Sequence, residues 1–141
     1  MPMIITKPLY TAEVSTTGGR EGHAKSSDGV LDLALTKPGA GKGTNPEQLM
    51  AAGWSACYQS AVQAIAKRDG LDASKSVVTV KVTLGNDETG SYGLKAEINL
   101  SVPGLALEQV QTLAKTADEM CPYSKATRGN IEVAVNAVPN S

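Results

Sequence analysis

One long helical segment, which begins at Asn45-Pro46, constrains the fold of this 141-residue chain more than any other feature. Proline disfavours the α conformation in the residue before it, so Asn45 suits the N-cap and Pro46 the first helical position. We expect the helix to run to about Arg68 and to stop near Gly70, a length of about 34 Å. Because its centre carries many small side chains, we expect it to be central and buried on more than one side; these residues are Ala51, Ala52, Gly53, Ser55, Ala56, Ala61 and Ala64.

Two segments after this helix alternate between apolar and polar side chains. They span residues 78–84 and 92–102 and are separated by a turn-forming stretch at 85–90. Each has one apolar face, which predicts an antiparallel pair packed on one side. A second helix over 107–120, a short helical turn and a last strand over 131–135 complete an α+β pattern.

The chain before the long helix has shorter elements. We expect a strand at 9–14, a loop at 15–22, a hairpin turn at 26–29, a strand at 30–35 and a flexible connector at 37–43. No linker or repeat separates these elements from the rest, so we expect a single domain over residues 1–141.

Charge and composition exclude several classes of function. A formal net charge of −1 argues against nucleic acid as a partner, and no apolar run approaches the roughly 18 residues that membrane insertion requires. The N-terminus lacks the features of a signal peptide, so we expect a cytoplasmic protein. With two cysteines, one histidine and no CxxC motif, we expect neither a metal site nor thioredoxin-type chemistry.

The two cysteines are the candidate reactive groups. A thiolate is the nucleophile in cysteine chemistry, so a reactive Cys57 needs a nearby cation. The alternative is a buried thiol that behaves as a small hydrophobe. Cys121 precedes a proline at a helix end, a position that suits a resolving thiol, or a thiol packed under the last strand. Spacing alone does not predict a disulfide, because the Cα atoms must come within about 7 Å.

Arg20 and Glu47 are the candidate activating pair. Arg20 lies on a glycine-flanked loop and would supply a permanent positive charge, unless it is an ordinary solvated side chain. Glu47 could orient this arginine, or it could serve the helix N-terminus in a Thr44-x-x-Glu47 capping box. A regular helix places Glu47 and Cys57 about 15 Å apart and about 80° out of line. A shared site therefore needs the long arginine side chain, a bend at Gly53 or a second chain.

Five segments together resemble the organic hydroperoxide resistance (Ohr) proteins, one branch of the OsmC/Ohr family. The resemblance covers nearly the whole chain, and the segment that begins at Cys121 favours the Ohr branch. The segments are Gly18-Gly19-Arg20-Glu21-Gly22, Ser27-Asp28-Gly29, Gly43-Thr44-Asn45-Pro46-Glu47-Gln48-Leu49, Ala52-Gly53 with Cys57, and Cys121-Pro122-Tyr123-Ser124-Lys125-Ala126-Thr127-Arg128-Gly129-Asn130.

This resemblance implies an intertwined α+β homodimer, with antiparallel sheets wrapped around two long central helices. It implies a Cys-based peroxidase that reduces organic hydroperoxides, has no bound cofactor and takes electrons from a lipoyl or other dithiol, carried by a lipoylated protein. Residue by residue, it implies Cys57 as the peroxidatic cysteine, Cys121 as the resolving cysteine, and Arg20 and Glu47 as the activating pair.

The walls of the substrate pocket are where this sequence departs from the family. Trp54 and Tyr58 stand where many relatives carry Tyr or Phe, and Met50 stands where Phe is common. We expect Met50, Trp54 and Tyr123 to line the pocket, although Trp54 and Tyr123 are equally candidates for the core. Three alternatives stay open: an OsmC-branch peroxidase, a non-enzymatic redox sensor or lipid-binding module, and a structural dimer with buried thiols.

Overall fold

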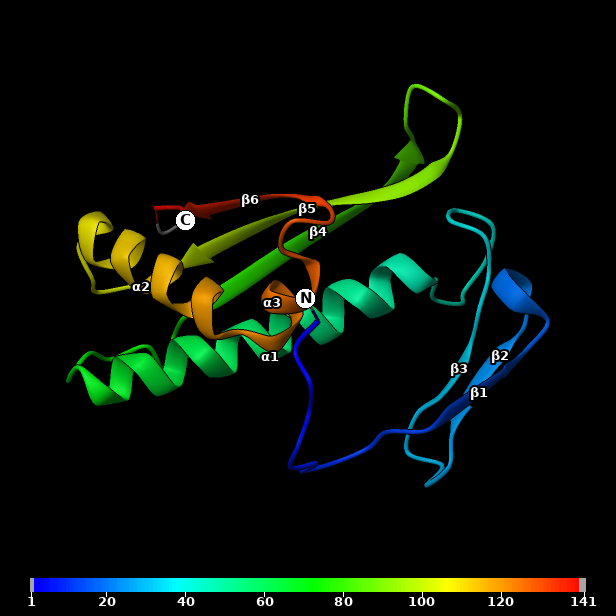
Figure 1. Ribbon diagram of the computed structural model, residues 1–141, viewed down its shortest axis with the longest axis horizontal. Helices are drawn as coiled ribbons and strands as arrows, with labels where there is room; N and C mark the ends of the chain where they lie inside the picture. Colours follow the sequence, from blue (N-terminus) through cyan, green and yellow to red (C-terminus); the bar gives the residue numbers. More distant parts are fainter. Residues whose placement is uncertain (1, 140–141) are drawn as a thin grey trace. The chain divides into compact units, whose positions relative to one another are not determined.

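A computed structural model describes residues 2–139 of the chain (Figure 1). The chain forms two compact units, the first ending at Pro46 and the second beginning at Glu47. The expectation that residues 1–141 act as one domain stays a prediction.

The first unit is a small antiparallel sheet. It contains β1 (Val14–Thr17), β2 (His23–Ser26) and β3 (Asp32–Ala34) in the order β1-β2-β3. The predicted hairpin turn at 26–29 is confirmed, because the Gly29 N–H donates to the Ser26 carbonyl oxygen at 3.0 Å. Gly29 has a φ of 77°, which a residue with a side chain rarely adopts.

The prediction of a strand at residues 9–14 is wrong, except that its last residue, Val14, belongs to β1. In the ladder, Val14 pairs with Ser26, and the chain turns towards β3 directly after Ser26. Residues 2–12 therefore extend past the end of β2, where no ladder partner continues. The loop expected at 15–22 is likewise shorter, because β1 takes up residues as far as Thr17. The strand expected at 30–35 shrinks to β3 because Val30 still belongs to the turn and is exposed.

The second unit follows the expected order of elements closely. Its helices are α1 (Pro46–Arg68), α2 (Leu107–Met120) and α3 (Pro122–Thr127), and its strands are β4 (Val77–Asn86), β5 (Tyr92–Ser101) and β6 (Glu132–Ala137). The antiparallel pairing of the two alternating segments is confirmed, with Val80 opposite Ile98.

The last strand corrects the expectation of purely antiparallel sheets. β6 pairs with β5 in parallel, with Ile98 opposite Val135. The reason is the connection: α2 and α3 lie between the two strands and return the chain to the end at which β5 began. A crossover of this length is what a parallel pair requires.

The core of the second unit lies between the sheet and the helices. α1 and α2 lie on the same side of the sheet (Figure 1), and residues from both helices and from β5 form one buried cluster. The side chains of Ile98, Leu100 and Val102 are completely or almost completely buried there. None of the helices in residues 2–139 is both long and apolar enough to cross a bilayer.

Helix α1 buries only one side, a single stripe of residues, within this chain. The sequence predicts burial on more than one side. The buried stripe consists of Trp54, Tyr58, Ala61, Val62, Ile65 and Ala66. The opposite side is exposed and small-sided, as at Ala52, Ala56, Ser60 and Ala64. Its small side chains leave this side flat, so a second helix would have to cover it to bury it.

Candidate functional site

The two cysteines meet where α1 passes the junction of α2 and α3. Cys57 lies in the middle of α1 and is half-buried against the core, whereas Cys121 is completely buried. Both are free thiols. Their side chains are close enough to share a hydrogen bond. The fold thus brings together the two thiols that the sequence keeps far apart.

The backbone at Cys121 fixes its side chain at the helix junction. The Cys121 N–H donates to the Ala117 carbonyl oxygen at 2.9 Å, and its own carbonyl oxygen accepts from the Lys125 N–H at 2.9 Å. Cys121 therefore ends α2 and starts α3 without an intervening loop. Pro122 explains the break, because it holds the residue before it in an extended conformation and suits the first position of α3.

Burial raises the pKa of the Cys57 thiol above its ordinary value. Repulsion from the Cys121 thiolate and the hydrogen bond to the Cys121 side chain raise this pKa further, while a hydrogen bond from the Tyr123 backbone N–H lowers it. The contacts with α3 alone therefore favour the thiol form of Cys57. A reactive thiolate at this position requires an additional positive charge.

Arg20 and Glu47 lie in different units. Arg20 is exposed in a short 3₁₀ helix, Gly19–Glu21, between β1 and β2. This turn is narrow, because a Cβ at Gly22 would lie 1.6 Å from the Thr17 carbonyl oxygen. Glu47 is half-buried in the first turn of α1. Their joint action on Cys57 stays a prediction.

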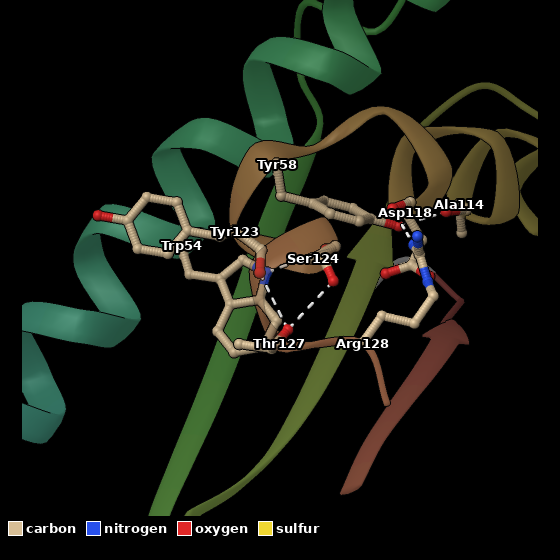
Figure 2. Close-up of polar contacts among 8 residues, drawn as sticks. All are labelled: Trp54, Tyr58, Ala114, Asp118, Tyr123, Ser124, Thr127 and Arg128. Atoms are coloured by element: carbon tan, nitrogen blue, oxygen red, sulfur yellow. Dashed lines mark hydrogen bonds and ion pairs between the residues drawn. The ribbon is translucent and has the colours of Figure 1, made fainter. Parts of the chain in front are cut away.

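The three residues expected to form pocket walls occupy different environments. Trp54 is fully buried, Met50 packs at the edge of the core, and Tyr123 is 39% exposed. The Trp54 and Tyr123 rings are stacked, with centroids 6.4 Å apart and an angle of 25° between their planes (Figure 2). The role of these residues as pocket walls stays a prediction.

Polar residues that sequence reasoning missed hold α3 in place. The Trp54 Nε1–H donates to the hydroxyl of the buried Ser124 at 3.2 Å (Figure 2). At the far end of α3, Arg128 donates through Nη2 to the Asp118 carbonyl oxygen at 2.7 Å and lies 3.3 Å from its carboxylate. The sequence held one signal for the Trp54–Ser124 contact. Ser124 follows Cys121 by three residues, so the two residues share one face of the helix.

Tyr58 ties α1 to α2 next to the cysteines. Its hydroxyl donates to the Ala114 carbonyl oxygen at 2.6 Å, and the side chain is completely buried (Figure 2). Burial, followed by the negative charges of Asp118 and Cys121, raises the pKa of Tyr58 far above its ordinary value. Tyr58 is therefore a neutral hydrogen-bond donor in this structure.

Helix α1 is continuous through Gly53, from Pro46 to Arg68. The absence of a side chain at Gly53 makes room for Tyr123 instead: a Cβ there would lie 2.6 Å from the Tyr123 hydroxyl oxygen.

Among residues 2–139, no group of three or more His, Cys, Asp or Glu side chains is arranged to hold a metal ion.

Comparison with known proteins assigns the chain to a family. The family model for OsmC-like proteins matches residues 39–136. The chain is 45% identical to the organic hydroperoxide resistance protein of Xanthomonas axonopodis pv. citri, over 92% of this chain and 94% of that protein. It is 43% identical to the organic hydroperoxide resistance protein OhrB of Bacillus subtilis, over 89% of this chain and 95% of that protein.

Solved structures agree with this assignment. The crystal structure of Bacillus subtilis OhrB superimposes with a TM-score of 0.85 at 40% identity, covering 93% of this chain and 100% of that one. A structure of an organic hydroperoxide resistance protein from Elizabethkingia anophelis superimposes with a TM-score of 0.84 at 42% identity. The match covers 96% of this chain and 100% of that one. This chain belongs to the OsmC/Ohr family, on the branch of the organic hydroperoxide resistance proteins.

Proposed function

We propose that this protein is a Cys-based peroxidase that reduces organic hydroperoxides to alcohols and contributes to resistance against oxidative stress. The observation that carries the proposal is the proximity of Cys57 and Cys121, two free thiols from distant parts of the sequence that lie close enough for Cys121 to raise the pKa of Cys57. The names of the relatives support the choice of organic hydroperoxide as the substrate class.

In the first step, the Cys57 thiolate attacks the terminal oxygen of the hydroperoxide. The S–O bond forms as the O–O bond breaks, and the alkoxide leaves with a proton as the alcohol. Cys57 is thereby oxidised to a sulfenic acid. Arg20, oriented by Glu47, supplies the positive charge that this thiolate requires, since the contacts with α3 favour the thiol.

In the second step, the Cys121 sulfur attacks the Cys57 sulfenic sulfur. The S–S bond forms, the S–O bond breaks, and the departing hydroxide takes up the Cys121 proton as water. A lipoyl or other dithiol then reduces the disulfide by exchange through a mixed disulfide, which returns both thiols and leaves the donor oxidised. Apart from this electron donor, which a lipoylated protein carries, the cycle needs no bound cofactor.

The functional unit in this proposal is a homodimer. The small-sided exposed face of α1 suits close approach of a second helix. The N-terminal segment adds a row of exposed apolar side chains that a partner would cover: Met3, Ile4, Ile5, Leu9 and Tyr10.

Peroxide consumption tests the proposal. Wild-type protein and the Cys57→Ser variant are given dihydrolipoamide or dithiothreitol, with either tert-butyl hydroperoxide or hydrogen peroxide. We expect many turnovers for the wild type, faster with the organic substrate, and none for Cys57→Ser. Absence of turnover with either dithiol would contradict the peroxidase assignment, and consumption of one equivalent only would favour a redox sensor.

A further inference from the structure

Helix α3 holds the thiol of Cys121 but is short, with only six residues. It meets α1 through the residues that follow Cys121. The Ser124 hydroxyl accepts from the Trp54 indole at 3.2 Å, and the Tyr123 ring stacks on Trp54 (Figure 2). The Tyr123 hydroxyl fits against Gly53. These contacts, here called the Trp54–α3 clamp, form no part of the proposed reaction itself.

The clamp and the thiol pair lie next to each other and are formed by the same two helices, α1 and α3. Trp54 precedes Cys57 by three residues on α1, and Ser124 follows Cys121 by three residues on α3, so each pair shares a helix face. The pairs 54/124 and 57/121 therefore connect the same two segments, one helical turn apart. A shift of α3 at Ser124 moves Cys121 with it, because the Cys121 carbonyl oxygen is part of the first turn of α3.

Helix α3 also borders a pocket. Ser124, Thr127 and Arg128 line a cavity of about 250 Å³ whose remaining wall includes Ile131, Val133 and Val135. The pocket leaves this part of α3 without close packing, and the Arg128 contacts with Asp118 tie only the far end of α3 to α2. The Trp54–Ser124 hydrogen bond is therefore a contact that keeps α3 against α1.

We propose that Trp54 and Ser124 are positioning residues for disulfide formation, which hold the Cys121 thiol within reach of the oxidised Cys57. This inference rests on the proposed peroxidase function. The step they serve joins the Cys121 sulfur to the Cys57 sulfenic sulfur with loss of water, and it needs no oxidant beyond the sulfenic acid. A disulfide tolerates Cα separations of only about 4.4–6.8 Å, so a displacement of about 1 Å is enough to slow this step.

The experiment separates the two steps in one turnover of the full-length protein. Reduced protein is mixed with one equivalent of tert-butyl hydroperoxide, quenched at intervals, and analysed by intact mass spectrometry for the sulfenic acid, trapped with dimedone, and for the disulfide. The variants are Ser124→Ala, which removes the acceptor, and Trp54→Phe, which keeps a ring but removes the donor. Ser124→Thr keeps the hydroxyl and adds one methyl group at a residue that lines the pocket.

We expect Ser124→Ala to lose the Cys57 thiol at a rate within about twofold of the wild type but to form the disulfide about tenfold more slowly, so that the sulfenic acid accumulates. Trp54→Phe should slow disulfide formation to a similar degree, and Ser124→Thr should restore it. Ser55→Ala is the matched control, because the Ser55 hydroxyl donates within α1 to Ala52 and does not bond α3. The Ser55→Ala variant should form the disulfide at the wild-type rate.

Wild-type rates of disulfide formation in both Ser124→Ala and Trp54→Phe would overturn the positioning role while leaving the peroxidase function intact. A wild-type protein that forms neither sulfenic acid nor disulfide would overturn the proposed function as well. Thermal unfolding of each variant shows that it is folded, and if Ser124→Ala does not fold, Trp54→Phe alone decides the result.

Discussion

The Tyr123 hydroxyl oxygen occupies the space beside Gly53 on α1, 2.6 Å from where a Cβ at Gly53 would lie. The ring of Tyr123 stacks on Trp54, and its backbone N–H reaches the Cys57 sulfur. One residue of α3 thus lies against three positions of α1, Gly53, Trp54 and Cys57, all on the side of α1 that carries Cys57. A glycine in mid-helix lowers helix stability, and here its cost is offset by this close approach.

Gly53→Ala should therefore displace Tyr123 without lowering stability. Alanine stabilises a helix by about 0.5–1 kcal/mol relative to glycine, and the half-exposed Tyr123 side chain can rotate away, so we expect the melting temperature to stay the same or rise. The displaced Tyr123 should leave Trp54, which shifts the fluorescence of this single tryptophan. The double variant Gly53→Ala/Tyr123→Phe should regain the wild-type spectrum, and an unchanged spectrum in the single variant would contradict the close contact.

Tyr58→Phe should destabilise the second unit and change its response to alkaline pH. The variant leaves the Ala114 carbonyl oxygen without its donor, at a cost of about 1–3 kcal/mol. Because the folded state raises the pKa of Tyr58, its stabilising effect is complete below about pH 10 and is lost as the pH rises above that value, where the unfolded chain releases the proton.

Urea unfolding of the wild type and Tyr58→Phe at a series of pH values between 8 and about 11 measures both effects. The wild type should lose stability more steeply than Tyr58→Phe above about pH 10. Tyr92→Phe is the control, since Tyr92 is 80% exposed and should change neither quantity. Parallel curves for the wild type and Tyr58→Phe would contradict a buried, neutral Tyr58.

Arg20→Ala should move the pH dependence of the reaction with hydroperoxide to higher pH. In the proposed function Arg20 stabilises the Cys57 thiolate, and an adjacent opposite charge shifts a pKa by about 1–3 units, so the rate at pH 7 should fall at least about tenfold. Arg20 is exposed, so thermal stability should change by less than about 0.5 kcal/mol.

Two further variants make the Arg20 measurement specific. Arg20→Lys keeps the charge and should retain part of the rate. Lys37→Ala removes another cation of the same unit, the ion-pair partner of Glu21 at 3.1 Å, and should leave the profile unchanged. Overlapping pH–rate profiles for the wild type and Arg20→Ala would remove Arg20 from the mechanism.

Cys121→Ala should lower the pKa of Cys57. Charge repulsion from Cys121 and the hydrogen bond between the thiols both raise that pKa, while burial, the larger cause, remains in the variant. The alkylation rate of Cys57 by iodoacetamide, followed against pH, should therefore have its midpoint at lower pH than the rate for Cys57 in the wild type. The same variant should form no intramolecular disulfide and should be overoxidised by excess hydroperoxide; an unchanged midpoint would show that the thiols do not interact.

The sequence by itself determined the main elements of the second unit. Proline at position 46, the alternation in the two long strands and the break at Pro122 are local signals, and the helices and strands begin and end close to where these signals predict. The first unit was predicted less well, because a strand extends only as far as its partner, and the turn after Ser26 is the reason that β1 begins at Val14. Likewise, the parallel direction of β6 depends on where a crossover returns the chain.

The motifs around Cys57 and Cys121 identified the family, but the contact between the two thiols is a property of the tertiary structure. It depends on α1 crossing the junction of α2 and α3, and no spacing along the chain encodes that crossing. The same holds for Ser124, Gly53 and Tyr58, whose partners lie many residues away. Sequence patterns report on neighbours within a turn or a strand pair, whereas the contacts that hold the thiol pair join segments that only the packed core brings together.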